Sequence, residues 1–120
     1  MLAVKLDANT LFRALALGIN RLHVQQCDIA RLDLPDRPFD VVTMLEVIEH
    51  LERPLEAIQT GLRLAARHLV VSVPSKEDDN PAHIHFLTRR KLETLFDEAG
   101  CRRVRFDGVP GHLIVIATLP

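Results

Sequence analysis

The sequence predicts an α/β fold built on a largely parallel sheet. Short apolar runs typical of buried strands alternate with longer segments whose apolar residues have helical spacing, as in strands joined by crossover helices. The chain has 120 residues, of which 48% are hydrophobic, so we expect one globular domain over residues 1–120. The last two strands are separated only by a short turn, which requires them to be antiparallel.

Two strands and one helix are predicted in the first part of the chain. Leu2–Leu6 has the composition of a strand and is followed by Asp7. A helix is expected to begin after Asn9 or Thr10, either of which can cap it, and to end at Gly18. Leu22–Gln26 alternates apolar with polar residues, which is typical of a half-buried or edge strand.

Two further strands flank a helix in the middle of the chain. Phe39–Leu45 is nearly continuous in apolar character, as buried parallel strands are. Helical spacing then extends from Leu55 to Ala66 behind Pro54, which suits the first helical turn. The next strand covers residues 68–73 and is closed by a proline.

The last part of the chain predicts a helix and a hairpin. Thr88 can cap a helix over residues 89–99, which Gly100 ends. The two final strands are expected at residues 101–106 and 112–118, joined by a turn over residues 108–111.

Composition and charge exclude several classes of protein. The longest apolar run, Leu113–Ala117, is far shorter than the ~20 residues of a membrane span. We find no signal peptide, and Cys27 and Cys101 form no CxxC pair, so we expect a cytoplasmic protein with reduced thiols. A formal charge of -1 gives no nucleic-acid-binding signature. Neither a membrane nor a nucleic acid is therefore an expected partner.

Acidic residues follow three of the predicted strands. Ligands of such sheets bind beyond the carboxyl ends of the strands, and Asp7, Asp28 and Glu46 stand at these ends. A carboxylate in this place can accept hydrogen bonds from ribose hydroxyls or from the exocyclic amine of adenine. The arrangement predicts a nucleoside-binding edge.

With these residues the chain resembles the class I S-adenosylmethionine-dependent methyltransferases. The similar stretches occur in family order, at residues 4–7, 26–28, 39–51, 69–74 and 83–89. The resemblance implies a Rossmann-like three-layer sandwich and methyl transfer from S-adenosylmethionine to an acceptor that the residues do not identify. It also implies that Asp7 binds the cofactor ribose, that Asp28 binds the adenine, and that Cys27 and Leu45 line the cofactor.

The Gly-rich first motif of that family has no counterpart here. None of the five glycines lies in a G-x-G arrangement, and the chain begins at the family's second strand, so we expect a shortened domain without the first, central strand. This chain alone is then expected to bind the cofactor weakly or not at all. Either the strand at Leu2 pairs directly with that at Val41, or a second copy or partner chain completes the sheet. A non-enzymatic module that pairs through this edge is the alternative function.

Glu46, Glu49 and His50 are spaced i, i+3 and i+4, which places them on one face if the segment is helical. Two carboxylates and an imidazole suit a divalent metal. The set resembles that of the small-RNA 3′-terminal 2′-O-methyltransferases, and a match on Thr88 and Arg89 gives His83 the role of a further ligand.

The same acid-histidine segment also occurs in methyltransferases without a metal, and we favour that interpretation. The aromatic side chains that would stack on RNA bases are nearly absent, since the chain has five Phe and no Trp or Tyr. With or without a metal, His50 and Glu46 are the candidate catalytic residues on the acceptor side.

Overall fold

The computed structural model describes residues 2–4, 23–25, 34–77, 79–81 and 83–120. The chain divides into two compact units, Met1–Asp33 and Leu34–Pro120. In the first unit, β1 (Leu2–Val4) and β2 (His23–Gln25) pair in parallel, as the sequence predicted for crossover-linked strands. The helix expected between them lies outside the described residues. The expectation of a single domain stays a prediction.

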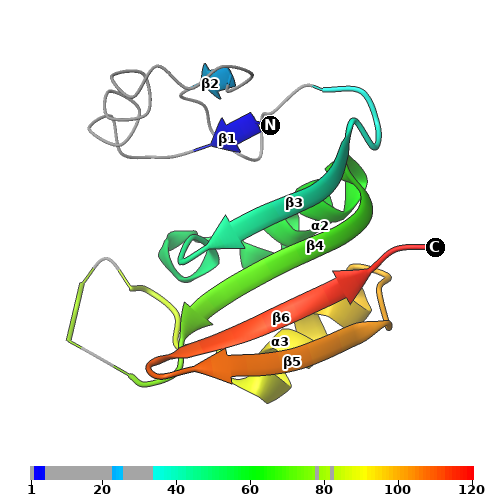
Figure 1. Ribbon diagram of the computed structural model, residues 1–120. Helices are drawn as coiled ribbons and strands as arrows, with labels where there is room; N and C mark the ends of the chain where they lie inside the picture. The colour runs from blue at the N-terminus through cyan, green and yellow to red at the C-terminus, as the bar shows by residue number, and fades with distance from the viewer. Residues whose placement is uncertain (1, 5–22, 26–33, 78, 82) are drawn as a thin grey trace. The chain divides into compact units, whose positions relative to one another are not determined.

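The second unit contains a four-stranded sheet in the order β3-β4-β6-β5 (Figure 1). Its strands are β3 (Phe39–Leu45), β4 (Ala65–Pro74), β5 (Val104–Val109) and β6 (His112–Thr118). β3 and β4 are parallel, while β6 is antiparallel to both β4 and β5. The predicted antiparallel hairpin at the end of the chain is confirmed.

Helix α2 (Pro54–Leu64) connects the two parallel strands. It begins at Pro54, as predicted. The proline ring fixes a helical φ, and the N–H that proline lacks would have no acceptor within the first turn of a helix. The prediction that helical structure continues to Ala66 is wrong. Ala65 is already extended and pairs with Phe39 in the β3–β4 register, so the strand begins directly where the helix ends.

Helix α3 (Arg89–Glu98) begins and ends where local signals place it. The Thr88 hydroxyl accepts a hydrogen bond of 3.2 Å from the Lys91 N–H, and Gly100 adopts a left-handed φ of 87°. β5 starts at Val104, later than predicted, and the hairpin turn is limited to Pro110 and Gly111.

Both helices lie on the same face of the four-stranded sheet (Figure 1). The core between helices and sheet is formed by apolar side chains, among them Met44, Ile58, Leu69, Val71, Leu92, Phe96 and Val115. This gives two of the three expected layers; a third is not among the described residues. Within the described part of the chain, no helix is long and apolar enough to cross a lipid bilayer.

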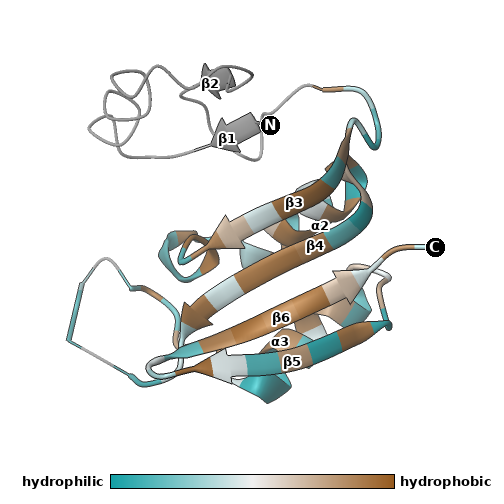
Figure 2. Ribbon diagram, viewed as in Figure 1, coloured by the Kyte–Doolittle hydropathy of each residue, from teal (hydrophilic) through white to brown (hydrophobic). Residues whose placement is uncertain are grey.

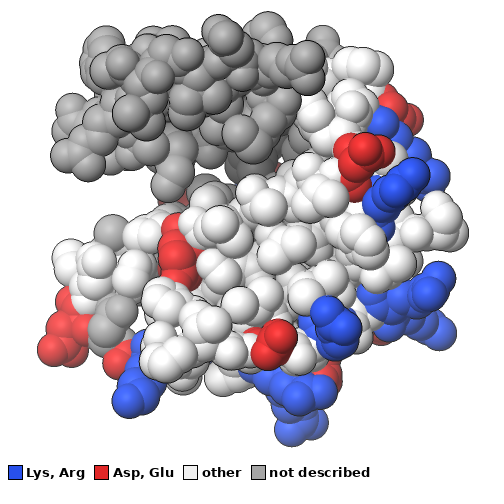
Figure 3. Space-filling view, viewed as in Figure 1, with Lys and Arg blue, Asp and Glu red and all other residues white. Residues whose placement is uncertain are grey.

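The opposite face of the sheet is apolar and open within the second unit. The strands there carry many hydrophobic residues (Figure 2), and Lys and Arg gather along the margins of this face (Figure 3). Val41 and Leu45 of β3 are 50% and 52% exposed. Within the two units, β1 pairs with β2 and β3 pairs with β4, and the expected pairing of the strand at Leu2 with that at Val41 stays a prediction.

Candidate active site

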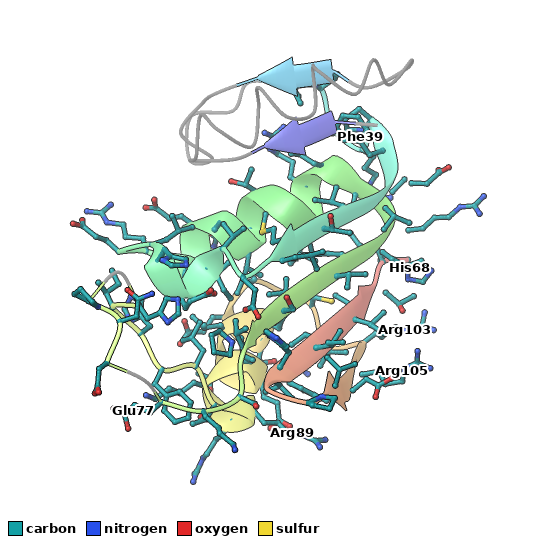
Figure 4. All side chains as sticks on the ribbon, turned by 60° about the vertical axis from the view of Figure 1, so that its left-hand side comes forward. Phe39, His68, Glu77, Arg89, Arg103 and Arg105 are labelled. Carbon is teal, nitrogen blue, oxygen red and sulfur yellow. The ribbon has the colours of Figure 1, made fainter. Side chains whose placement is uncertain are left out.

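The candidate site is built at the carboxyl ends of β3 and β4. These strands are parallel, so the segments that follow them meet at one edge of the sheet. Figure 4 shows Glu77, in the loop after β4, at the end of the sheet opposite Phe39 and His68. The short 3₁₀ helix η2 (Ile48–His50) follows β3 at this edge.

Glu46 makes the transition from β3 into this segment. Its φ is 56°, a left-handed backbone conformation that residues other than glycine seldom adopt. The Glu46 N–H donates a 3.0 Å hydrogen bond to the carbonyl of Ser72 in β4, which holds the residue at the end of the strand pair. Its carboxylate contacts Nδ1 of His112, the first residue of β6. The backbone turn therefore directs Glu46 toward the hairpin.

Glu49 is the most deeply buried ionisable group of the site, with 1% of its side chain exposed. Neither of its carboxylate oxygens has a hydrogen-bond partner among the described residues. His50 Nε2 lies 3.4 Å from Glu49 Oε1, which is within ion-pair range but without hydrogen-bond geometry. A buried carboxylate without hydrogen bonds is costly, so this group is unusual in a folded protein.

Burial raises the pKa of the Glu49 carboxyl above its ordinary value. The nearby backbone N–H of Glu49, although outside hydrogen-bond geometry, acts against this increase in pKa, and the negative charge of Glu46 adds to the increase. The charges of His50 and His83 lower the pKa of Glu49. The ionisation of Glu49 therefore depends on its burial and on the charges of Glu46, His50 and His83.

His83 reaches the same place from the loop after β4. The rings of His50 and His83 meet edge to face, with centroids 4.6 Å apart and an angle of 66° between their planes. One ligand atom from each of Glu49, His50 and His83 lies within 4.8 Å of the other two. The N–H of His85 donates to the Glu49 carbonyl at 3.3 Å, which ties this loop to η2.

The structure thus brings together three of the four predicted metal-ligating residues, Glu49, His50 and His83. Glu46 is not a member of this cluster, because η2 starts only at Ile48 and the left-handed turn directs the Glu46 carboxylate to His112. The predicted catalytic pair, Glu46 and His50, lies at one edge of the sheet but in separate contacts.

His112 was not singled out from the sequence, although a signal was present. It directly follows the hairpin turn, and antiparallel pairing of β6 with β4 places it opposite Pro74, next to the end of the parallel strands. Of the predicted cofactor-binding residues, Leu45 ends β3 with its side chain about half exposed. Asp7, Cys27 and Asp28 lie outside the described residues.

A family model described as a methyltransferase domain matches residues 6–105. The chain therefore belongs to the methyltransferase domain family, and its open mixed sheet with helices is the Rossmann-like fold of the class I S-adenosylmethionine-dependent methyltransferases. The fold class expected from the sequence resemblance is confirmed. No curated protein sequence matches the chain.

Solved structures of methyltransferases share the fold at low sequence identity. A methyltransferase dependent on S-adenosylmethionine from Aquifex aeolicus has a TM-score of 0.75 and 18% identity, with 99% of this chain and 68% of that chain covered. The 1,6-didemethyltoxoflavin-N1-methyltransferase of Burkholderia thailandensis was solved with 1,6-didemethyltoxoflavin and S-adenosylhomocysteine bound. Its TM-score is 0.79 and its identity 20%, with 98% of this chain and 60% of that chain covered.

A third similar structure is a complex from Haloferax volcanii between a methyltransferase activator and a protein classed as a methyltransferase. Its TM-score is 0.80 and its identity 13%, with 99% of this chain and 71% of that chain covered. This chain thus spans between 60% and 71% of the three chains compared.

Proposed function

We propose that the chain is a domain that transfers a methyl group from S-adenosylmethionine to an acceptor. The observation that carries this proposal is the position of Glu46 and His50 directly after β3, at the edge where parallel sheets bind ligands, in a chain matched by the methyltransferase family model. The bound S-adenosylhomocysteine in one similar structure supports the choice of cofactor.

Methyl transfer is an in-line displacement at the sulfonium carbon, so the protein mainly aligns the acceptor with the methyl group. His50 is the proposed general base for the acceptor, because 29% of its side chain is exposed and its Nε2 lies 3.4 Å from the buried Glu49 carboxylate. Glu46, held by Ser72 and facing His112, is the second residue of the acceptor side.

On the cofactor side, Asp7 is proposed to bind the ribose and Asp28 the adenine, with Cys27 and Leu45 lining the nucleoside. The sequence has no G-x-G segment to present backbone N–H groups to the amino-acid end of the cofactor. We therefore propose that this chain recognises chiefly the nucleoside and binds the whole cofactor weakly.

Calorimetric titration with adenosine and with S-adenosylhomocysteine tests this proposal. The two dissociation constants should agree within about tenfold, which is about 1.4 kcal/mol. Asp28→Asn should weaken the binding of adenosine and of S-adenosylhomocysteine at least about tenfold each, since hydrogen bonds to a charged group contribute about 1.5–3 kcal/mol. The matched control Asp40→Asn, at an exposed position of β3, should change neither. Micromolar binding of S-adenosylhomocysteine by a chain that ignores adenosine contradicts the proposed weak, nucleoside-led binding.

The second candidate is an interaction module or subunit, favoured by the place of β3 at one margin of the four-stranded sheet. In the second unit β3 is an edge strand, and its Val41 and Leu45 side chains are half exposed. Unpaired strand edges recruit strands from other chains. The complex with an activator among the similar structures supports a protein partner, and a second copy of this chain is the simplest one.

Light scattering coupled to size exclusion separates the two candidates. A dimer that Val41→Lys converts to monomer supports edge pairing, since a lysine on the edge opposes strand addition. Val109→Lys is the matched control, because Val109 is similarly exposed, at 53%, on the other edge strand. A native chain that remains monomeric at all concentrations removes this candidate. With no disulfide framework from its two cysteines, a cytoplasmic location is proposed for either function.

A further inference from the structure

A groove beside helix α3 in the second unit takes no part in the proposed function. It is bounded by α3, by the start of α2 and by the loop that precedes α3, and its volume is about 510 Å³. Pro54, Leu87 and Leu95 give it apolar walls. Leu95 is only partly buried, so apolar surface beside α3 stays in contact with water.

The charged side chains of α3 differ in whether the chain neutralises them. Those that do not line the groove are held in ion pairs, Arg89 Nε with Glu93 Oε1 at 3.1 Å and Asp97 Oδ1 with Arg102 Nε at 3.0 Å. The three that line the groove, Arg90, Lys91 and Glu98, are exposed and form no ion pair among the described residues. Lys91 Nζ donates only to the Phe86 carbonyl, at 3.1 Å. The groove therefore presents two cations and one anion to the solvent.

These charges have a self-complementary arrangement along α3. Arg90 and Lys91 lie in its first turn and Glu98 is its last residue. Lys91, Leu95 and Glu98 are spaced i, i+4 and i+7, which places them on one stripe of the helix, with about 10 Å between its charged ends. If two copies of α3 lie antiparallel about a twofold axis between Thr94 and Leu95, Lys91 of each helix is opposite Glu98 of the other.

We propose that this groove is a contact surface between two copies of the chain, which pack α3 against α3 in antiparallel orientation. The apolar contact of Leu95 with the walls of the other groove supplies most of the affinity, because exposed ion pairs contribute little. The charges fix the orientation, since parallel packing would place like charges side by side.

A contact limited to one helix and its flanks is small, so the dimer is weak and forms as the protein is concentrated. It requires neither cofactor nor acceptor and does not involve β3. The proposal is therefore separate from methyl transfer and from pairing through the β3 edge.

Sedimentation velocity of the full chain at increasing concentration measures the dimer. The basic variant Glu98→Lys and the acidic variant with Arg90→Glu and Lys91→Glu each give the groove charge of a single sign. Each should raise the dissociation constant of the dimer at least about tenfold, because the twofold axis repeats every substitution. An equimolar mixture of the two variants should recover a heterodimer. The chain that carries all three substitutions should dimerise again.

Arg105→Glu is the matched control, because Arg105 is an exposed cation of β5 that does not line the groove. This variant should dimerise like the native chain, and far-UV circular dichroism shows whether each variant is folded. A native chain that stays monomeric up to about 1 mM overturns the proposal. So does a mixture of the folded basic and acidic variants that forms no heterodimer. A dimer that Val41→Lys dissociates and both charge variants leave intact is paired through β3 and overturns it as well.

Discussion

Gly61 of α2 faces the side chain of Met44 in β3 so closely that a β-carbon on Gly61 would lie 2.8 Å from Met44 Cε. The two methyl groups of Leu69 would lie 2.9 and 3.0 Å away. The helix therefore approaches the sheet at the only helical position of α2 that has no side chain. This contact sets the distance between α2 and the strands that lead into the candidate site.

Gly61→Ala should lower the free energy of unfolding by about 1 kcal/mol. Overpacking a core costs about 1–3 kcal/mol, and the better helix propensity of alanine returns about 1 kcal/mol. Urea denaturation measures the difference. Met44→Leu, which removes the atom nearest to the added carbon, should recover part of the loss in the double variant. Strictly additive effects of the two substitutions would contradict the contact.

Thr88→Ala should destabilise the protein by about 1 kcal/mol, because it removes the hydroxyl that accepts the Lys91 N–H at the start of α3. Thr94→Ala is the matched control in the same helix. The Thr94 hydroxyl donates only to the Arg90 carbonyl, which already belongs to the helix, so this change should be neutral or slightly stabilising. Equal losses of thermal stability in both variants would exclude a capping role for Thr88.

Glu46→Gly and Glu46→Ala should differ in stability although both remove the carboxylate. The φ of 56° at this position is strained for alanine and relaxed for glycine. We expect the glycine variant to be more stable than the alanine variant by about 1 kcal/mol, measured by chemical denaturation. The same pair of substitutions at Glu77, in the exposed loop after β4, provides the comparison for a residue without this left-handed φ. If alanine is the better replacement at position 46, the left-handed turn is not present in solution.

The contribution of Glu49 to the free energy of unfolding should fall as the pH rises above the ordinary pKa of a glutamate. The pKa of Glu49 is raised in the folded state, so the native protein holds this proton more tightly than the unfolded chain does. Stability is then lost between the unfolded and the folded pKa. The groups that face Glu49 are Glu46, whose charge strengthens the effect, and His50 and His83, which weaken it.

Glu49→Gln removes this titration. The variant should be more stable than the native chain at neutral pH, and the difference should shrink as the pH falls below the ordinary pKa of a glutamate. Denaturant unfolding at a series of pH values measures both curves. A difference that is the same at every pH would show that burial of Glu49 does not perturb its ionisation.

The elements with strong local signals could be predicted from the sequence. Thr88 and Gly100 delimit α3, and Pro54 begins α2, because capping and proline geometry act within one turn of the chain. The end of α2 could not be predicted in the same way. Ala65 carries no helix-ending signal, and its extended conformation is fixed by pairing with Phe39, which is distant in sequence.

The candidate site shows the same division. The location of Glu49 and His50 after a predicted strand follows from local pattern, and the resemblance to a family added His83; the strand itself, expected to be buried, has only Met44 buried. The left-handed turn at Glu46 could not be foreseen, because no glycine marks it. The contact of Glu46 with His112 depends on the pairing of β6 with β4, whereas the sequence predicts antiparallel pairing only within the hairpin of β5 and β6.

The half-exposed Val41 and Leu45 on edge strand β3 have a practical consequence for work with this protein. A shortened variant that begins at Leu34 would present a hydrophobic strand with unpaired backbone groups to the solvent. Such strands are templates for fibril growth and precipitation. Preparations of that variant should therefore become turbid on concentration, and a charged residue in β3 should keep them clear.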